Sequence, residues 1–216
     1  MGFSLNSIAY RISAKSRARK HAFFMASLKP NETDTILDVG ANAIEYSDTD
    51  NYLEKHYPHG ENITVVSLDD VSALKTLYPK VTFIQADGTK LPFEENQFNI
   101  AYSNAVIEHV GNYQAQLDFL KELYRVSTRG YITTPNRHFP IEIHTRVPFL
   151  HLLLPKTLFD KFLHVIGKGW AAEDYMTLLT KNDLLKLLQD AQITQFQITH
   201  NRFLGLTMTY TLTWTK

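Results

Sequence analysis

The strongest constraint on the fold is the regular alternation, from Thr35 onward, of short β-branched or aromatic segments with helical segments. This rhythm is typical of a parallel sheet whose strands are connected by crossover helices. It predicts five strands, at residues 35–39, 63–67, 81–84, 98–102 and 131–134. Because no repeat or low-complexity linker interrupts the pattern, we expect a single domain over residues 1–216.

Two helices can be placed from side-chain spacing. Apolar residues recur three and four positions apart from Tyr113 to Tyr124, and Gly130 is expected to follow the end of this helix. A second helix is expected to begin at Thr180, because Thr180 and Asp183 have the spacing of a capping box before a leucine-rich run.

The chain ends in two alternating segments, residues 196–198 and 206–214, joined by a turn region that contains Asn201 and Gly205. A hairpin connection makes the final strand antiparallel. We therefore predict an α/β fold with a seven-stranded, mostly parallel sheet, an antiparallel last strand and helices on both faces.

Basic residues are concentrated at the N-terminus. Residues 1–31 contain six Lys and Arg residues and no acidic residue, although the whole chain has 22 of each sign. The spacing of Ile8, Ile12, Phe24 and Leu28 predicts an amphipathic helical arm over residues 1–30 that ends before Pro30. We expect this arm to pack on the domain and to face an anionic substrate or a membrane surface; a solvated helix face is the alternative.

Composition excludes several classes of protein. The chain has no cysteine, which excludes disulfides, thiolate zinc sites and thiol nucleophiles. The apolar stretches are broken by Pro148, His151 and Pro155, well short of the ~20 residues that span a bilayer. We expect a cytoplasmic protein, with peripheral contact to a membrane as the one further option.

In an open parallel sheet, ligands bind beyond the carboxyl ends of the strands. The first predicted strand runs into ILDVGANA, the third into QADG and the fourth into YSNAVIEH. These segments, and above all ADGTKLPFEENQFN at 86–99, resemble the class I S-adenosylmethionine-dependent methyltransferases, most closely the type-eleven methyltransferase domain. The resemblance covers roughly residues 35–134 and implies a Rossmann-like fold.

The resemblance also implies S-adenosylmethionine as cofactor and S-adenosylhomocysteine as product. Asp38 and Gly40 match the acidic residue and the first glycine of the turn that meets the methionine part of the cofactor. Asp87 matches the acid that accepts a hydrogen bond from the adenine amino group, and Gly88 matches the neighbour that keeps the ring slot open.

Two further positions follow from the resemblance. Ser103 and Asn104 lie where the fourth strand of the family meets the methionyl group and the incoming nucleophile. Taken singly, an acid at the end of a strand could cap a turn, and Asp-Gly is an ordinary turn signal. The combination is what favours a cofactor site.

The chain departs from the family pattern in two places. Asn42, which we include in the cofactor site, and Ile44 stand where the family usually has glycine, so the loop from 40 to 52 should have a different shape. We expect residues 47–50 to cap a helix that begins later than usual. At the second strand, Ser67 stands at the position that binds ribose, and we assign that role to Asp69 instead.

Residues 135–175 form an insertion that we expect to cover the acceptor site. Methyl transfer is an in-line displacement that requires alignment and removal of a proton from the acceptor. His144 is the first candidate for the general base, followed by His109 and His138. Metal ligation by His138, Glu142 and His144 fits no defensible spacing, so no metal site is predicted.

These features favour methyl transfer to the oxygen, nitrogen or carbon of a small-molecule or lipid- or glycan-linked acceptor. A nucleic acid is disfavoured, because the chain carries no excess of basic residues and Ser103–Val106 lacks a Pro-Pro-aromatic step. The altered glycine turn and Ser67 keep an alternative open, a methyltransferase-like binding or scaffold protein without catalysis.

Overall fold

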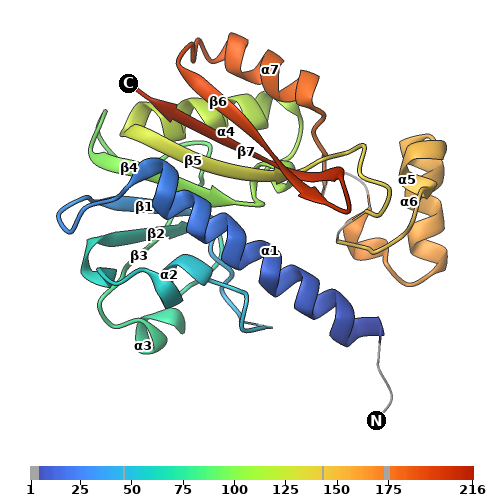
Figure 1. Cartoon of the computed structure of the whole chain (residues 1–216), viewed down its shortest axis with the longest axis horizontal. Coiled ribbons are helices and arrows are strands. Elements are labelled where there is room, and N and C mark those ends of the chain that lie inside the picture. Colours follow the sequence, from blue (N-terminus) through green and yellow to red (C-terminus); the bar gives the residue numbers. More distant parts are fainter. Residues whose placement is uncertain (1–4, 46, 143, 173–175) are drawn as a thin grey trace.

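The computed structural model describes residues 5–45, 47–142, 144–172 and 176–216. One seven-stranded sheet has the order β3-β2-β1-β4-β5-β7-β6 (Figure 1). β1 to β5 pair in parallel, and β7 lies antiparallel between β5 and β6, as predicted. The strands are β1 (Ile36–Val39), β2 (Ile63–Ser67), β3 (Thr82–Gln85), β4 (Phe98–Asn104), β5 (Ser127–Pro135), β6 (Phe196–Phe203) and β7 (Leu206–Thr215).

Side chains that alternate along the strands build two cores, one on each face of the sheet. Leu37 and Val39 pack with the helices α4 and α7, whereas Ile36 packs with α1, α2 and α3. Helices therefore cover both faces, as expected (Figure 1). The helices are α1 (Leu5–Leu28), α2 (Tyr52–His56), α3 (Leu74–Leu77), α4 (Tyr113–Val126) and α7 (Lys181–Asp190), with the short 3-10 helices η1 (Gly60–Asn62) and η2 (Ile107–His109).

Helix α1 is the predicted basic arm, and it packs across the sheet. The Phe24 side chain is fully buried and lies edge-on to Tyr102 and Tyr131, with ring centroids 5.1 and 5.3 Å apart. The Tyr131 hydroxyl donates to the backbone carbonyl of Lys20 at 2.8 Å. Because these contacts fix the helix against β4 and β5, its residues 12–20 are held at the carboxyl edge of the sheet.

Two local predictions have different outcomes. The capping box at Thr180 and Asp183 is confirmed, with both reciprocal hydrogen bonds present. The predicted boundary between the fourth helix and the fifth strand is wrong, because α4 ends at Val126 and β5 begins at Ser127. Gly130 lies inside the strand, where a Cβ atom would come within 2.0 Å of the Trp214 ring. Close packing of that ring explains the glycine.

The predicted insertion at 135–175 leaves β5 as a loop and then forms α5 (Leu150–Leu153), α6 (Lys156–Val165) and the short helix η3 (Gly169–Ala171). Residues 143 and 173–175 of the insertion lie outside the described part of the chain. Phe159 and Leu163 are buried in a small separate core with Val147. No helix within the described residues is both long and apolar enough to cross a membrane.

Candidate active site

The loop after β1 is held by a side chain where the family uses glycines. Gly40 has a positive φ of 102°, and its N–H donates to the Val66 carbonyl at 2.8 Å. The Asn51 amide accepts from the Asn42 N–H and donates to the Asn42 carbonyl, each at 3.0 Å. This reciprocal pair fixes the backbone at Asn42, which explains how the loop does without the second glycine.

Helix α2 begins at Tyr52. The prediction that residues 47–50 cap it is wrong, because Asn51, with a left-handed φ of 47°, occupies the N-cap position. Residues 47–50 instead close a turn of their own, in which the Ser47 N–H donates to Asp50 Oδ2 at 3.0 Å.

A cavity of about 270 Å³ opens at the carboxyl ends of β1 and β4. Asp38 forms part of its wall and is buried. Burial and the negative charge of neighbouring Glu54 raise the pKa of Asp38 well above its usual range, and the Arg17 guanidinium opposes this shift. The lining includes the predicted cofactor residues Asp38, Gly40, Asn42 and Asn104, and the histidines His109 and His144.

The ends of β2 and β3 place the predicted ribose and adenine residues. Asp69 is exposed just beyond β2, whereas the Ser67 hydroxyl is buried and donates to the Ala41 carbonyl at 3.2 Å. Asp87 is exposed beyond β3, and its Oδ1 accepts from the Thr89 N–H and hydroxyl, each at 2.8 Å. Both carboxylates therefore stand at the cofactor edge of the sheet and are accessible.

Gly88 is required by packing. A Cβ atom there would lie 2.7 Å from the Phe119 ring and 3.0 Å from Val39, both in the core. The glycine thus lets α4 approach the end of β3. Its predicted role beside the adenine ring stays a prediction.

The two predicted residues of β4 differ in their surroundings. Ser103 is fully buried, and its hydroxyl donates to the Val39 carbonyl at 2.9 Å, which joins β4 to β1. Asn104 lines the cavity, and its Oδ1 accepts from Lys20 Nζ at 3.2 Å and from the Thr133 hydroxyl at 2.7 Å. Of the pair, Asn104 is the residue that a ligand in the cavity can reach.

Two of the three histidines proposed as the base come together. His109 Nε2 and His144 Nε2 are 3.2 Å apart, and His144 Nδ1 lies 2.9 Å from Glu142 Oε1. Burial lowers the pKa of His144, but Glu142 and the charge of Glu108 outweigh burial and raise it overall. His138 is exposed, and its backbone N–H donates to Asn136. It lies outside the lining of the cavity that holds the other two.

Three residues of the site were missed as functional positions by sequence reasoning. Lys20 is buried, and burial together with Arg17 lowers its pKa to about 8, against the charge of Glu108. Glu108 is also fully buried, next to His109 in sequence, and Asn51 closes the loop. The only signal for Glu108 was its place at the end of a strand, and nothing local marked Lys20 among the other basic residues of its helix.

Comparison with known proteins agrees with this geometry. Residues 37–132 match the family model described as a methyltransferase domain. An S-adenosylmethionine-dependent methyltransferase structure from Methanosarcina mazei shares 18% identity over 87% of this chain and 94% of that chain, with a TM-score of 0.56. No curated protein matches the sequence.

Two liganded structures share the fold. The 1,6-didemethyltoxoflavin-N1-methyltransferase of Burkholderia thailandensis, with bound 1,6-didemethyltoxoflavin and S-adenosylhomocysteine, has 17% identity and a TM-score of 0.59 over 93% of this chain and 78% of that chain. The magnesium protoporphyrin IX methyltransferase of Synechocystis, with bound S-adenosylhomocysteine, has 13% identity and a TM-score of 0.60 over 100% of this chain and 89% of that chain.

The sheet order, the cavity at its carboxyl edge and the matched domain define a Rossmann-like methyltransferase that uses S-adenosylmethionine. The chain therefore contains a segment, residues 37–132, that matches the methyltransferase domain, and it shares the fold of S-adenosylmethionine-dependent methyltransferase structures. It is accordingly an enzyme of the methyltransferase class, and the alternative of a non-catalytic scaffold is not supported.

Proposed function

We propose that this enzyme methylates a small-molecule acceptor that carries an anionic group. The observation behind the proposal is a run of three cavities that share walls. The cavity beside Asp38 shares Asn104, Ala105 and His144 with a second cavity of about 320 Å³. The second shares Lys20, Phe203 and Met208 with a third of about 480 Å³ between α1 and the β6–β7 hairpin.

The first cavity suits the cofactor. Its wall carries the Asp38 carboxyl group, which can match the cationic ammonium of S-adenosylmethionine, and Asp69 and Asp87 follow along the same edge. When bound there, the cofactor supplies an activated methyl group on a sulfonium sulfur. The acceptor then belongs on the far side of Asn104, in the second cavity, which Phe139, His144 and Arg146 of the insertion also line.

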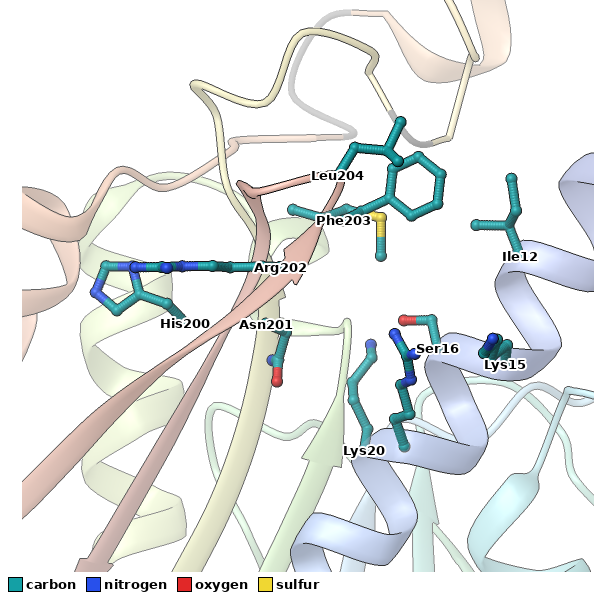
Figure 2. A pocket seen from close by; sticks show the side chains of 11 residues that line it. Ile12, Lys15, Ser16, Lys20, His200, Asn201, Arg202, Phe203 and Leu204 are labelled. Atoms are coloured by element: carbon teal, nitrogen blue, oxygen red, sulfur yellow. The ribbon is translucent and has the colours of Figure 1, made fainter.

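The third cavity is the reason for proposing an anionic acceptor. Figure 2 shows Lys20 of α1 pointing into the space between α1 and the hairpin, whereas the Arg202 side chain runs from the hairpin toward His200. Among the described residues, the lining of this cavity contains four Lys and Arg side chains and no acidic side chain. An acceptor that extends from Asn104 into this space would place a carboxylate or phosphate among these cations.

Lys20 is positioned to take the proton of the acceptor. It lines both the second and third cavities, and a pKa of about 8 leaves part of the amine neutral near neutral pH. His144 keeps its proton to a higher pH than an ordinary histidine, which weakens the earlier expectation that it is the base. Activity should therefore rise with pH through about 8.

A lipid-linked acceptor is the second form of the same chemistry. Leu204, which also lines the third cavity, is 87% exposed at the hairpin turn, so an apolar tail could leave the cavity there. Both the free and the lipid-linked acceptor would carry the anionic group. Assays with acceptors in solution and in vesicles distinguish the two forms.

The test is transfer of a labelled methyl group to a panel of acceptors that are matched except for an anionic group, free in solution or in vesicles. We expect anionic acceptors to be used, with Arg19→Ala, which removes another cation of the third cavity, raising KM for them severalfold at little cost in kcat. Equal use of neutral and anionic acceptors would contradict the proposed acceptor class. Methyl transfer only to acceptors held in vesicles would identify the lipid-linked form.

A further inference from the structure

Glu108, His109 and His144 place three potential metal ligands at one point. His144 Nε2 lies 3.2 Å from His109 Nε2 and 3.9 Å from Glu108 Oε1, and the ligand atoms of all three lie within 4.8 Å of one another. Two ligand atoms that share a tetrahedral ion at ~2.1 Å are themselves ~3.4 Å apart. The two imidazoles already have this spacing, and the carboxylate needs only a small movement.

The surrounding residues orient these ligands. His144 Nδ1 lies 2.9 Å from Glu142 Oε1, and in the neutral imidazole a proton held between them leaves the Nε2 lone pair directed toward His109 and Glu108, where a cation would displace any second proton. The Glu108 Oε2 atom accepts from the Thr134 hydroxyl at 3.0 Å, which fixes the plane of its carboxylate. Carboxylate support behind a ligating histidine is the usual arrangement around protein-bound metal ions.

Glu108 itself gives an independent indication. Its side chain is fully buried, and Oε1 has no hydrogen-bond partner among the residues that the structure describes. A buried carboxylate oxygen without a partner is costly, because it has lost its hydration and gained no hydrogen bond in exchange. A cation between Oε1 and the two imidazoles would remove that cost.

We infer that Glu108, His109 and His144 form a binding site for a divalent transition-metal ion. Two imidazoles and one carboxylate suit ions such as Zn²⁺, Mn²⁺ or Fe²⁺ better than Mg²⁺, which prefers oxygen ligands. This site differs from the ligand set considered and set aside from the sequence, because it contains neither His138 nor Glu142 as a ligand.

The place of the site suggests what the ion does. His109 and His144 line the cofactor cavity, and His144 also lines the acceptor cavity. Three protein ligands leave coordination positions open, and an oxygen of the acceptor could occupy one of them. This role rests on the proposed function, whereas the binding of the ion does not.

The test uses the full chain, freed of metal by dialysis against a chelator and titrated separately with Zn²⁺, Mn²⁺ and Mg²⁺ in a calorimeter. We expect one ion per chain, with Zn²⁺ bound more tightly than Mn²⁺ and Mg²⁺ bound most weakly. Glu108→Gln, which keeps an acceptor for Thr134, and His144→Ala should each lower the Zn²⁺ affinity at least tenfold. His138→Ala, an exposed histidine of the same insertion, is the matched control and should bind as the unaltered protein does.

Absence of Zn²⁺ binding by the folded protein, or binding that survives both ligand substitutions, would overturn the site. If Glu108→Gln does not fold, His109→Ala replaces it in the comparison. Titration with S-adenosylhomocysteine on the same samples separates the two proposals. Metal binding without methyl transfer to any acceptor would refute the proposed function alone, and methyl transfer without metal binding would refute the metal site alone.

Discussion

Val106 packs directly over Gly40: a Cβ atom at Gly40 would lie 2.3 Å from Val106 Cγ2. The two residues follow β1 and β4, neighbouring strands whose carboxyl ends form the cavity beside Asp38. Gly40 also has a φ of 102°, where side chains are strained. The turn after β1 is therefore fixed both by its own backbone and by the strand beside it.

Gly40→Ala should destabilise the protein by about 1–3 kcal/mol, because the added methyl group overlaps Val106 and the backbone is strained. Chemical denaturation measures this change. The double variant Gly40→Ala with Val106→Ala should recover part of the loss, since it removes the overlap and leaves the strain. A double variant no more stable than the single one would show that Val106 is not the obstacle.

Asp87→Ala should weaken binding of S-adenosylhomocysteine by roughly tenfold, if its carboxylate accepts from the adenine amino group. Asp87 is exposed, and its other contacts are local ones to Thr89, so the fold should remain intact. Calorimetric titration measures the affinity, and circular dichroism checks the fold. Asp118→Ala, which removes a half-buried acid on α4 that accepts a local hydrogen bond from Gln114, is the control. Equal dissociation constants for Asp87→Ala and the unaltered protein would remove this assignment.

Binding of S-adenosylhomocysteine should strengthen as pH rises above the usual range of aspartate pKa values. Burial and Glu54 raise the pKa of Asp38, so the free protein holds a proton that the ammonium of the ligand displaces. Calorimetry in buffers of different ionisation enthalpy would detect the released proton. Asp38→Asn should bind more weakly and lose the pH dependence. An unchanged pH dependence in that variant would assign the proton to another group.

Lys20→Met should stabilise the protein at pH 7 by about 1–3 kcal/mol while it lowers methyl transfer. The pKa of Lys20 is lowered to about 8 by burial, so the folded state holds the charged amine at a cost. The contact between the Tyr131 hydroxyl and the Lys20 carbonyl is made by the backbone and remains. Thermal denaturation and the methyl-transfer assay are the two measurements. A variant that is less stable than the unaltered protein would contradict the cost assigned to this charge.

The sign of the pH effect follows from linkage. The pH window lies between the lowered pKa of Lys20, about 8, and the higher pKa of an ordinary lysine. Within it, the unfolded chain holds a proton at Lys20 that the folded protein has released. The contribution of Lys20 to stability should therefore increase as pH rises through this window. Lys20→Met should show a flatter dependence there than the unaltered protein.

The elements whose signals are local could be predicted from the sequence alone. The alternation of strands and helices, the capping box at Thr180 and Asp183, and the final hairpin all depend on periods of two or 3.6 residues or on a few neighbouring side chains. The strand ends then located Asp38, Asp87 and Asn104, because parallel strands bring their carboxyl ends to one edge.

Which distant residues meet at that edge depends on the tertiary packing. Lys20 reaches Asn104 across 84 positions of the chain, and His109 reaches His144 across 35. Gly130, assigned from sequence to the end of a helix, is instead required by the Trp214 ring on β7. Such contacts depend on the order of the strands and the path of each loop, and neither leaves a periodic pattern in the sequence. Burial, which shifts the pKa of Lys20 and leaves an oxygen of Glu108 without a partner, arises only when these segments pack together.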